Sequence, residues 1–228
     1  MKRAFPILAI VTALLLSFAL YEALIGAPTE RTMGDVQRIF YYHVPSAWTA
    51  FVLFLMNFVS SIIYLARRNI KADILALVSA EVGVVFCTVV IVTGPIWARP
   101  VWGIWWAPGD IRLTTTLVLW LIYISYLVLR RFSTSSQTPV IAAVVAIFGA
   151  LDVPLVYFSI WFFRTQHPSP VIGGGGSLDP RMAHVLLISW AAFMCLAWLL
   201  CWTRFRLEVL KREVEEAQAL ESLLEGSQ

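Results

Sequence analysis

The sequence predicts an all-α integral membrane protein, with six transmembrane helices in one bundle and both termini in the cytoplasm. Of its 228 residues, 60% are hydrophobic and 14% are charged, whereas soluble domains are about half apolar and a quarter charged. The mean hydropathy is +0.79. Six apolar stretches of about 20 residues are each long enough to cross a hydrocarbon core about 30 Å thick.

Helices are the expected spanning form, because strands of an open sheet would leave backbone groups unpaired in lipid. The first stretch follows Met1-Lys2-Arg3. It is longer than the core of a signal peptide and has no clear cleavage site, so we interpret it as an uncleaved helix. The expected spans are Phe5–Ile25, Ala47–Ala66, Ile74–Thr93, Leu113–Leu129, Val140–Trp161 and Met182–Trp202.

The basic residues predict the orientation of the bundle, since cytoplasmic loops carry the excess of Lys and Arg. One side carries Lys2, Arg3, Arg67, Arg68, Lys71, Arg130, Arg131, Arg204, Arg206, Lys211 and Arg212. The other carries about half as many, and all are arginine: Arg31, Arg38, Arg99, Arg112, Arg164 and Arg181. This poorer side is predicted to be periplasmic and to hold the loops 26–46, 94–112 and 162–181.

The second of these loops contains the most unusual segment of the chain, Trp102-Gly103-Ile104-Trp105-Trp106-Ala107-Pro108-Gly109-Asp110-Ile111-Arg112. Gly and Pro interrupt it, so we expect a structured loop at the membrane surface and not an ordinary spanning helix. Its three tryptophans are denser than interfacial anchors require, and they suit a platform for a flat aromatic ligand such as a porphyrin. The simpler role of interfacial anchor is assigned to Trp97, Trp161, Trp190 and Trp202.

Two of the three histidines fall in the loops on either side of this segment. His43 belongs to the first outer loop and His167 to the third, each near a proline that restricts the backbone. Neutral imidazole is a common axial ligand of haem iron, so the pair is a candidate ligand set. The alternative is a plain helix-start or loop histidine at each position. His184 lies about a turn inside the last helix on the same side.

Charged residues beside the tryptophans complete the candidate site. Arg99 and Arg112 flank the run and offer guanidinium groups to the two propionates of a porphyrin. Asp110 carries the same charge as a propionate, so we expect it to hold Arg112 or a loop amide instead.

Several classes of function are excluded or disfavoured. There is no phosphate-binding loop to power transport, and the stretch Gly173–Gly176 with Ser177 lacks its lysine and is interpreted as a flexible link. The three cysteines form no C-x-x-C pattern, so thiol–disulfide chemistry and covalent attachment of haem are not expected. No constellation suggests hydrolysis, and the dispersed basic residues do not predict nucleic-acid binding.

Two carboxylates fall inside predicted spans, Glu81 and Asp152. A charge at the bilayer centre costs roughly 2.5–3.5 kcal/mol on insertion scales, so each should face the bundle or lie near a helix end. A helix-to-helix hydrogen bond is the expected role. The alternative is a polar path through the bundle, as a permease subunit of a haem or solute exporter would require.

The tail 207–228 differs in character from the membrane domain, 1–206. Its apolar residues recur at spacings of three and four with glutamates between them, which predicts an amphipathic cytoplasmic helix. The acidic surface disfavours anionic lipid, so a protein partner or a contact within the chain is expected. The apolar positions are Leu207, Leu210, Val214, Ala217, Leu220 and Leu224.

Taken together, these motifs resemble the haem exporter protein C (CcmC) family of bacterial cytochrome c maturation, which belongs to a wider family with a tryptophan-rich outer loop. The resemblance spans nearly the whole bundle. The matching stretches are Arg38-Ile39-Phe40-Tyr41-Tyr42-His43-Val44-Pro45-Ser46-Ala47, Thr93-Gly94 through Trp106, Asp110, Arg112-Leu113-Thr114, Pro154-Leu155, Tyr157-Phe158-Ser159, His167 and Ser177-Leu178-Asp179-Pro180. One departure is Ala107-Pro108-Gly109, where the family pattern has a further tryptophan directly before the aspartate.

The resemblance implies a protein of the bacterial inner membrane that is not an enzyme and that binds haem b without a covalent bond at its periplasmic face. Its metal ligands would be His43 and His167, and its haem platform Trp102, Gly103, Trp105 and Trp106 with Asp110, Arg112 and Arg99. It would present haem to a periplasmic haem chaperone. The implied companions are the ATPase and permease subunits of an ABC transporter and a small membrane subunit. A haem-attaching lyase and an assembly subunit that docks through its tail are the remaining alternatives.

Overall fold

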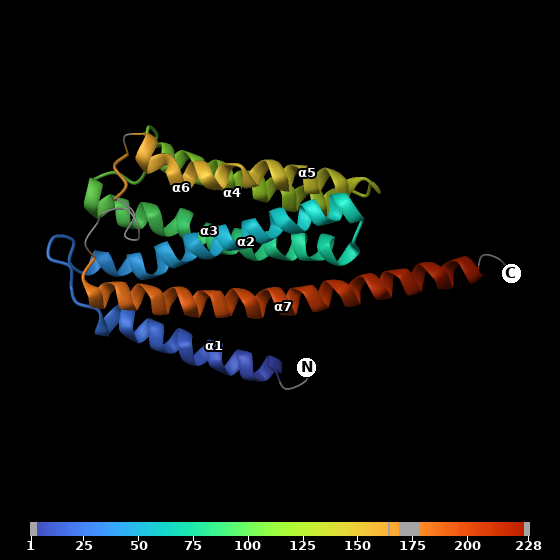
Figure 1. Cartoon of the computed structure of the whole chain (residues 1–228), viewed down its shortest axis with the longest axis horizontal. Helices are drawn as coiled ribbons and strands as arrows, with labels where there is room; N and C mark the ends of the chain where they lie inside the picture. Colours follow the sequence, from blue (N-terminus) through green and yellow to red (C-terminus); the bar gives the residue numbers. More distant parts are fainter. Residues whose placement is uncertain (1–3, 164, 169–177, 226–228) are drawn as a thin grey trace.

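The computed structural model describes residues 4–163, 165–168 and 178–225. The predictions for Lys2, Arg3, Arg164 and the glycine-rich link at 173–177 lie outside these residues. The elements are α1 (Ala4–Tyr21), η1 (Glu22–Gly26), η2 (Asp35–Ile39), α2 (Phe40–Arg67), α3 (Ile70–Trp102), α4 (Ile111–Phe132), α5 (Thr138–Ala150), α6 (Asp152–Phe162) and α7 (Pro180–Glu225) (Figure 1).

Six helical segments are long and apolar enough to cross a membrane, as predicted. In three of them, formed by α3, α4 and α7, a single α-helix is the span, and in the second the 3-10 turn η2 precedes α2. In the first, the π-helical turn η1 continues α1, and in the fifth α5 and α6 together form the span. The described residues contain no β-strand, which confirms the all-α membrane class.

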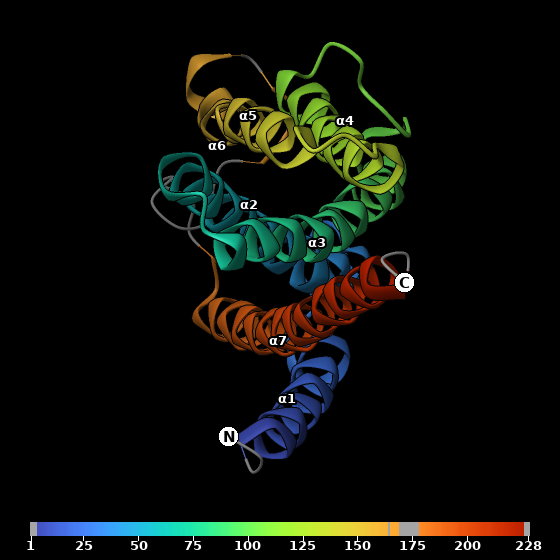
Figure 2. The ribbon, with the colours of Figure 1, turned by 90° about the vertical axis from the view of Figure 1, so that its right-hand side faces the viewer.

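The helices pack in layers. Seen along the bundle, α1 lies against α7, α7 against the pair α2 and α3, and this pair against α4, α5 and α6 (Figure 2). The α2–α3 contact is close because Gly83 faces Phe54; a Cβ at Gly83 would lie 2.7 Å from the Phe54 ring. Phe54 in turn stacks on Tyr123 of α4, with ring centroids 3.8 Å apart. This aromatic contact links the central layer to the outer one.

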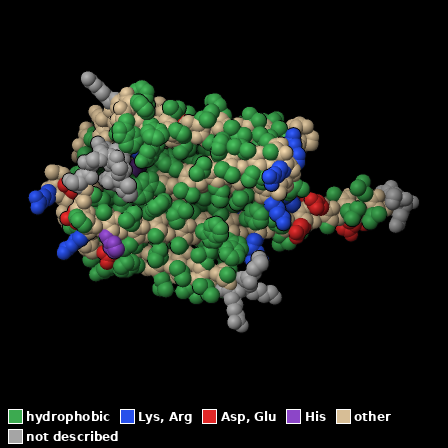
Figure 3. Space-filling model, in the orientation of Figure 1, with side chains coloured by type: hydrophobic (Ala, Val, Ile, Leu, Met, Phe, Trp, Pro, Cys, Tyr) green, Lys and Arg blue, Asp and Glu red, His purple; other side chains and the backbone are tan. Residues whose placement is uncertain are grey.

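The bundle has two distinct ends. The site end holds the segments 27–39 and 103–110 and the described residues between α6 and α7; the tail end holds the α2–α3 and α4–α5 turns, and the C-terminal helix projects beyond it. The surface between the ends is mostly hydrophobic, and blue Lys and Arg side chains gather at the tail end (Figure 3). Which end faces the cytoplasm stays a prediction.

Three boundaries differ from the sequence-based expectations. α3 does not end before the tryptophan segment but continues through Pro95 and Pro100 to Trp102, so the predicted loop 94–112 is reduced to 103–110. Prolines are tolerated there because neighbouring helices and side chains satisfy the freed carbonyls in membrane bundles. The helix ends at Gly103, whose φ of 78° is left-handed and favours glycine. His43 likewise lies in the first turns of α2 and not in a loop.

The fifth predicted span is broken at Leu151 into α5 and α6. Pro154 explains the break, since its ring has no N–H for the carbonyl of Ala150 and would clash with it in a straight helix. Asp152 begins α6 and is 8% exposed.

The tail continues the last membrane-spanning helix without a break, and the division of the chain after residue 206 stays a prediction. α7 is one helix of 46 residues, and its first tail turns pack on the bundle. Arg212 donates to Asp73 of α3 over 2.9 Å and to Glu208 over 3.2 Å. Asp73, 3% exposed, also accepts two bonds from Arg130 of α4. The expected contact within the chain is therefore confirmed, whereas residues 213–225 are exposed.

We expect Arg212→Ala to lower the free energy of unfolding by about 1.5–3 kcal/mol, the range for a hydrogen bond to a charged group. Asp73 would keep Arg130, so the loss should stay below that of a fully unpaired buried charge. Lys211→Ala is the matched control, because Lys211 forms only an exposed pair with Glu215 and should change stability by less than ~0.5 kcal/mol. Unfolding by SDS titration in mild detergent would measure both; equal losses would contradict the role of Arg212.

Candidate functional site

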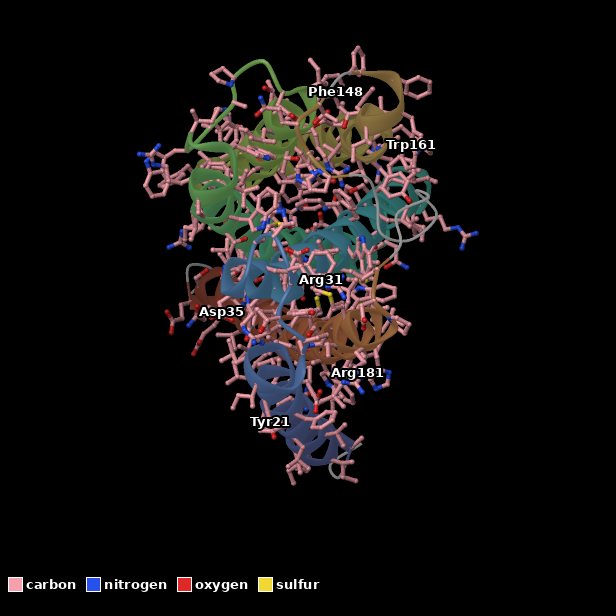
Figure 4. The ribbon with its side chains drawn as sticks, turned by 90° about the vertical axis from the view of Figure 1, so that its left-hand side faces the viewer. Tyr21, Arg31, Asp35, Phe148, Trp161 and Arg181 are labelled. Atoms are coloured by element: carbon pink, nitrogen blue, oxygen red, sulfur yellow. The ribbon has the colours of Figure 1, made fainter. Side chains whose placement is uncertain are left out.

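A cavity of about 930 Å³ opens among α2, α3, α4 and α7 at the site end. This volume is near the upper limit of small-molecule pockets, roughly 300–1,000 Å³. Figure 4 looks onto this end, with Arg31 from the segment before η2 near its centre (Figure 4). The lining is mainly apolar and aromatic, and its polar members include both candidate histidines, Arg112, Tyr157 and Arg31.

His43 enters the cavity from the first turns of α2. Its Nδ1 lies 2.9 Å from the hydroxyl oxygen of Thr93 on α3. Its Cε1 atom lies next to Gly94 of the same helix: a Cβ atom at Gly94 would be 3.5 Å from this Cε1. One edge of the imidazole is thus held against α3.

His167 comes from the segment between α6 and α7, and it meets His43 across the cavity. The two ring centroids are 6.3 Å apart, with an angle of 30° between the ring planes. The ring of Trp102 lies edge-on to His167 with centroids 6.3 Å apart. The predicted ligand pair and part of the tryptophan run therefore line one cavity, although 124 positions separate the two histidines in sequence.

Asp110 links these elements through its two carboxylate oxygens. Oδ1 accepts from the backbone N–H groups of Arg112 and Leu113, at 3.0 and 3.2 Å, and so caps the N-terminus of α4. Oδ2 accepts from the Thr165 hydroxyl and, over 2.9 Å, from the Gln166 N–H. Asp110 thus holds loop amides, as the sequence predicted, and one of them directly precedes His167.

The groups around Asp110 favour the ionised form of its carboxyl group. Burial raises the pKa of its carboxyl group, but the hydrogen bonds from Thr165, Gln166 and Leu113 outweigh that effect and hold the pKa below its ordinary value. A carboxylate that accepts several bonds in the folded state stabilises the fold above its unfolded pKa, and this contribution is lost as the pH falls through the folded pKa.

Arg112 is the candidate anion ligand within the cavity. Its Nη1 atom is shielded from solvent and has no hydrogen-bond partner among the described residues. An unpaired guanidinium nitrogen in an apolar cavity is costly unless a ligand pairs with it. Arg99 lies elsewhere: its guanidinium donates to the Gly103 carbonyl at the end of α3 and is not part of the cavity lining.

The tryptophans divide into two groups. Trp102 and Trp106 line the cavity, whereas Trp105 is 58% exposed and does not. The role of plain interfacial anchor needs correction for two others. Trp97 lines the cavity and packs edge-on against Trp102 at 5.3 Å, and Trp190 of α7 lines it beside Trp48, also at 5.3 Å.

The remaining residues that the sequence analysis considered for the site do not line the cavity. Gly103 and Asp110 shape the walls without lining the cavity, and His184 is exposed in the second turn of α7. Sequence reasoning missed the contact of Thr93 with His43 and the cavity positions of Trp48 and Arg31. Arg31 carried a usable signal, since every basic residue on the poorer side is arginine, and Thr93 belongs to the matching stretch that begins with Thr93-Gly94. Trp48 is indistinguishable from an ordinary helix residue.

The structure gives little support to the polar path through the bundle that a permease subunit would need. Glu81 is taken up by a bidentate pair with Arg204, at 2.8 and 2.9 Å, and so fills the expected structural role. Asp152 is buried, and its Oδ2 atom has no hydrogen-bond partner among the described residues.

Comparison with known proteins shows to which family the chain is similar. The model of the family described as "Heme exporter protein C" matches residues 1–220. A protein of that name from Bradyrhizobium diazoefficiens is 34% identical over 223 residues, which cover 96% of this chain and 84% of its own. Its namesake in Escherichia coli K12 is 29% identical over 220 residues, covering 96% and 89%.

Proposed function

Because the chain belongs to the haem exporter protein C family, we propose that it binds haem in the cavity at the site end and delivers it for cytochrome c maturation. The single observation that carries the proposal is the meeting of His43 and His167 across an aromatic cavity. The polypeptide handles haem without transforming it, and it supplies ligation, orientation and shielding.

The spacing of the histidines fits one iron between them. A metal lies about 2.0–2.1 Å from an imidazole nitrogen, and that nitrogen lies about 1 Å from the centre of its own ring. Two imidazoles that bind one metal from opposite sides therefore have ring centroids roughly 6–6.5 Å apart. The centroids here are 6.3 Å apart. No group of three or more His, Cys, Asp or Glu side chains suited to a metal occurs among the described residues. A pair of histidines suits a metal whose other ligands come from a porphyrin.

The rest of the cavity fits the remainder of a haem molecule. Trp102 and Trp106 offer apolar ring surface, and the unpaired Nη1 of Arg112 offers a charge-assisted bond to a propionate. Haem would be held without a covalent bond, because the three cysteines form no C-x-x-C arrangement, although Cys87 is among the residues that line the cavity. We assign the site end to the periplasmic side of the bacterial inner membrane on the distribution of Lys and Arg.

Delivery then requires a partner at that face. A periplasmic haem chaperone would receive the haem where the cavity opens, and the ABC transporter ATPase and permease subunits and the small membrane subunit would complete the assembly. The exposed end of α7, at the opposite end of the bundle, is available for a cytoplasmic partner.

Titration of the purified chain in lipid nanodiscs with haem tests the proposal. We expect about one haem per chain, as a single cavity of this size allows, with an absorption spectrum of two imidazole ligands. His184→Ala is the control and should give the same spectrum. A chain that retains no haem even in excess would contradict the proposal.

The ionisation of His167 provides a separate test in the haem-free protein. Loss of solvation, followed by the nearby charges of Arg112 and His43, lowers the pKa of its imidazole from 6.5 to about 3. We expect its NMR signal, identified by its absence in His167→Ala, not to titrate between pH 7.5 and 5. Because the unfolded chain binds the proton and the folded one does not, this site destabilises the fold as the pH falls from about 6.5 toward 3. Titration near pH 6.5 would contradict the prediction.

A further inference from the structure

The hydrogen bonds around Thr93 determine which nitrogen of His43 carries a proton. The Thr93 hydroxyl lies 2.6 Å from the carbonyl oxygen of Val89, one turn earlier in α3. A carbonyl can only accept, so the single hydroxyl proton of Thr93 is donated to Val89. The Thr93 oxygen is then an acceptor for any other partner.

That other partner is His43, whose Nδ1 is 2.9 Å from the same oxygen. Nδ1 must therefore carry the proton and donate it, which leaves Nε2 unprotonated with its lone pair free. Nδ1 and Cε1 contact α3 at Thr93 and Gly94, whereas Nε2, the next ring atom after Cε1, takes no part in the hydrogen bond that holds the ring to that helix. Only the unprotonated nitrogen of a neutral imidazole can bind a metal.

We propose that Thr93 is a positioning residue, which fixes the tautomer and the ring orientation of His43 so that Nε2 is ready to bind haem iron. The inference rests on the proposed function in naming haem as the ligand. A partner that fixes a metal-binding histidine in this way also makes the ring a stronger donor to the metal, and losing such a partner costs about 10–100-fold in metal affinity.

The same helix contains a matched control. The Thr88 hydroxyl donates to the Val84 carbonyl over 2.7 Å and accepts from the indole N–H of Trp120 over 2.9 Å. It thus makes the same two kinds of bond as Thr93, but with a ring outside the ligand pair. Thr88→Val and Thr93→Val remove the same hydroxyl from α3, and only the second should affect haem.

The experiment compares the wild-type chain with Thr93→Val, Thr93→Ser and Thr88→Val in nanodiscs. Nitrogen-15 NMR of labelled histidine reports the tautomer of His43 in the haem-free protein, with its signal identified by its loss in His43→Ala. Haem titration reports the affinity. We expect a single tautomer protonated at Nδ1 in the wild type, Thr93→Ser and Thr88→Val, and mixed tautomers in Thr93→Val.

Haem affinity should fall by about 10–100-fold in Thr93→Val and stay within about twofold of wild type in Thr93→Ser and Thr88→Val. A wild-type His43 protonated at Nε2, or a Thr93→Val variant with unchanged tautomer and affinity, would overturn the inference. A wild-type chain that binds no haem would instead refute the proposed function, and the tautomer measurement would still decide the role of Thr93.

Discussion

Alanine at His43 or at His167 is expected to reduce haem affinity by more than ~100-fold, beyond the ~10–100-fold cost of losing a group that only orients a metal ligand. Each substitution removes one of the two imidazoles that meet across the cavity with centroids 6.3 Å apart. The absorption spectrum should also change, because an iron with one imidazole ligand differs from an iron with two. Titration in nanodiscs with spectra recorded at saturation would measure both effects.

His184→Ala is the matched control for this prediction. It removes the remaining histidine of the chain, which lies exposed in α7 outside the cavity lining, and should leave affinity and spectrum unchanged. If either cavity variant retained the wild-type spectrum, that histidine would not be an axial ligand. If both retained it, haem would bind elsewhere on the protein.

Substitution of Asp110 is expected to have the second-largest effect, because one side chain supports two elements of the site. Asp110→Ala removes the N-cap of α4, at a cost of about 0.5–2 kcal/mol in stability. It also releases Thr165 and Gln166, so that His167 is no longer held opposite His43. We expect haem affinity to fall by about 10–100-fold, as for other groups that orient a metal ligand.

Two further variants separate these effects. Asp110→Asn keeps an oxygen for the cap but places an NH₂ group where Thr165 and Gln166 donate, so haem affinity should fall with little loss of the cap. Asn69→Ala removes another N-cap, that of α3, where Asn69 accepts from the Ala72 N–H. It should lower stability without weakening haem binding. Equal haem affinity in Asp110→Ala and Asn69→Ala would contradict the role of Asp110 in placing His167.

Much of the fold could be predicted because membrane insertion imposes a local rule. A helix that crosses the hydrocarbon core needs about 20 apolar residues in a row, and each of the six spans satisfies this requirement within its own segment. The boundaries were less predictable. α3 continues through two prolines to Trp102, because packed neighbours rescue backbone groups that proline leaves unpaired, and no local pattern reports those neighbours.

The sequence by itself also determined the main components of the site. Six crossings place the loops before α2, after α3 and after α6 at one end, so His43, the tryptophan run and His167 had to lie at the same end. The expectation that Asp110 holds Arg112 or a loop amide, and not a propionate, follows from its charge alone. These conclusions need only the number of crossings and the chemistry of single side chains.

Only the tertiary structure decided which residues meet within that end. The hydrogen bonds from His43 to Thr93 and from Gln166 to Asp110 join residues 50 and 56 positions apart. The cavity is lined by Trp97 and Trp190, whereas Trp105 is exposed. Such contacts depend on the rotation and tilt of whole helices, which are set by packing such as that of Gly83 against Phe54. Hydropathy and motif spacing contain no information on that rotation, because they describe each segment separately.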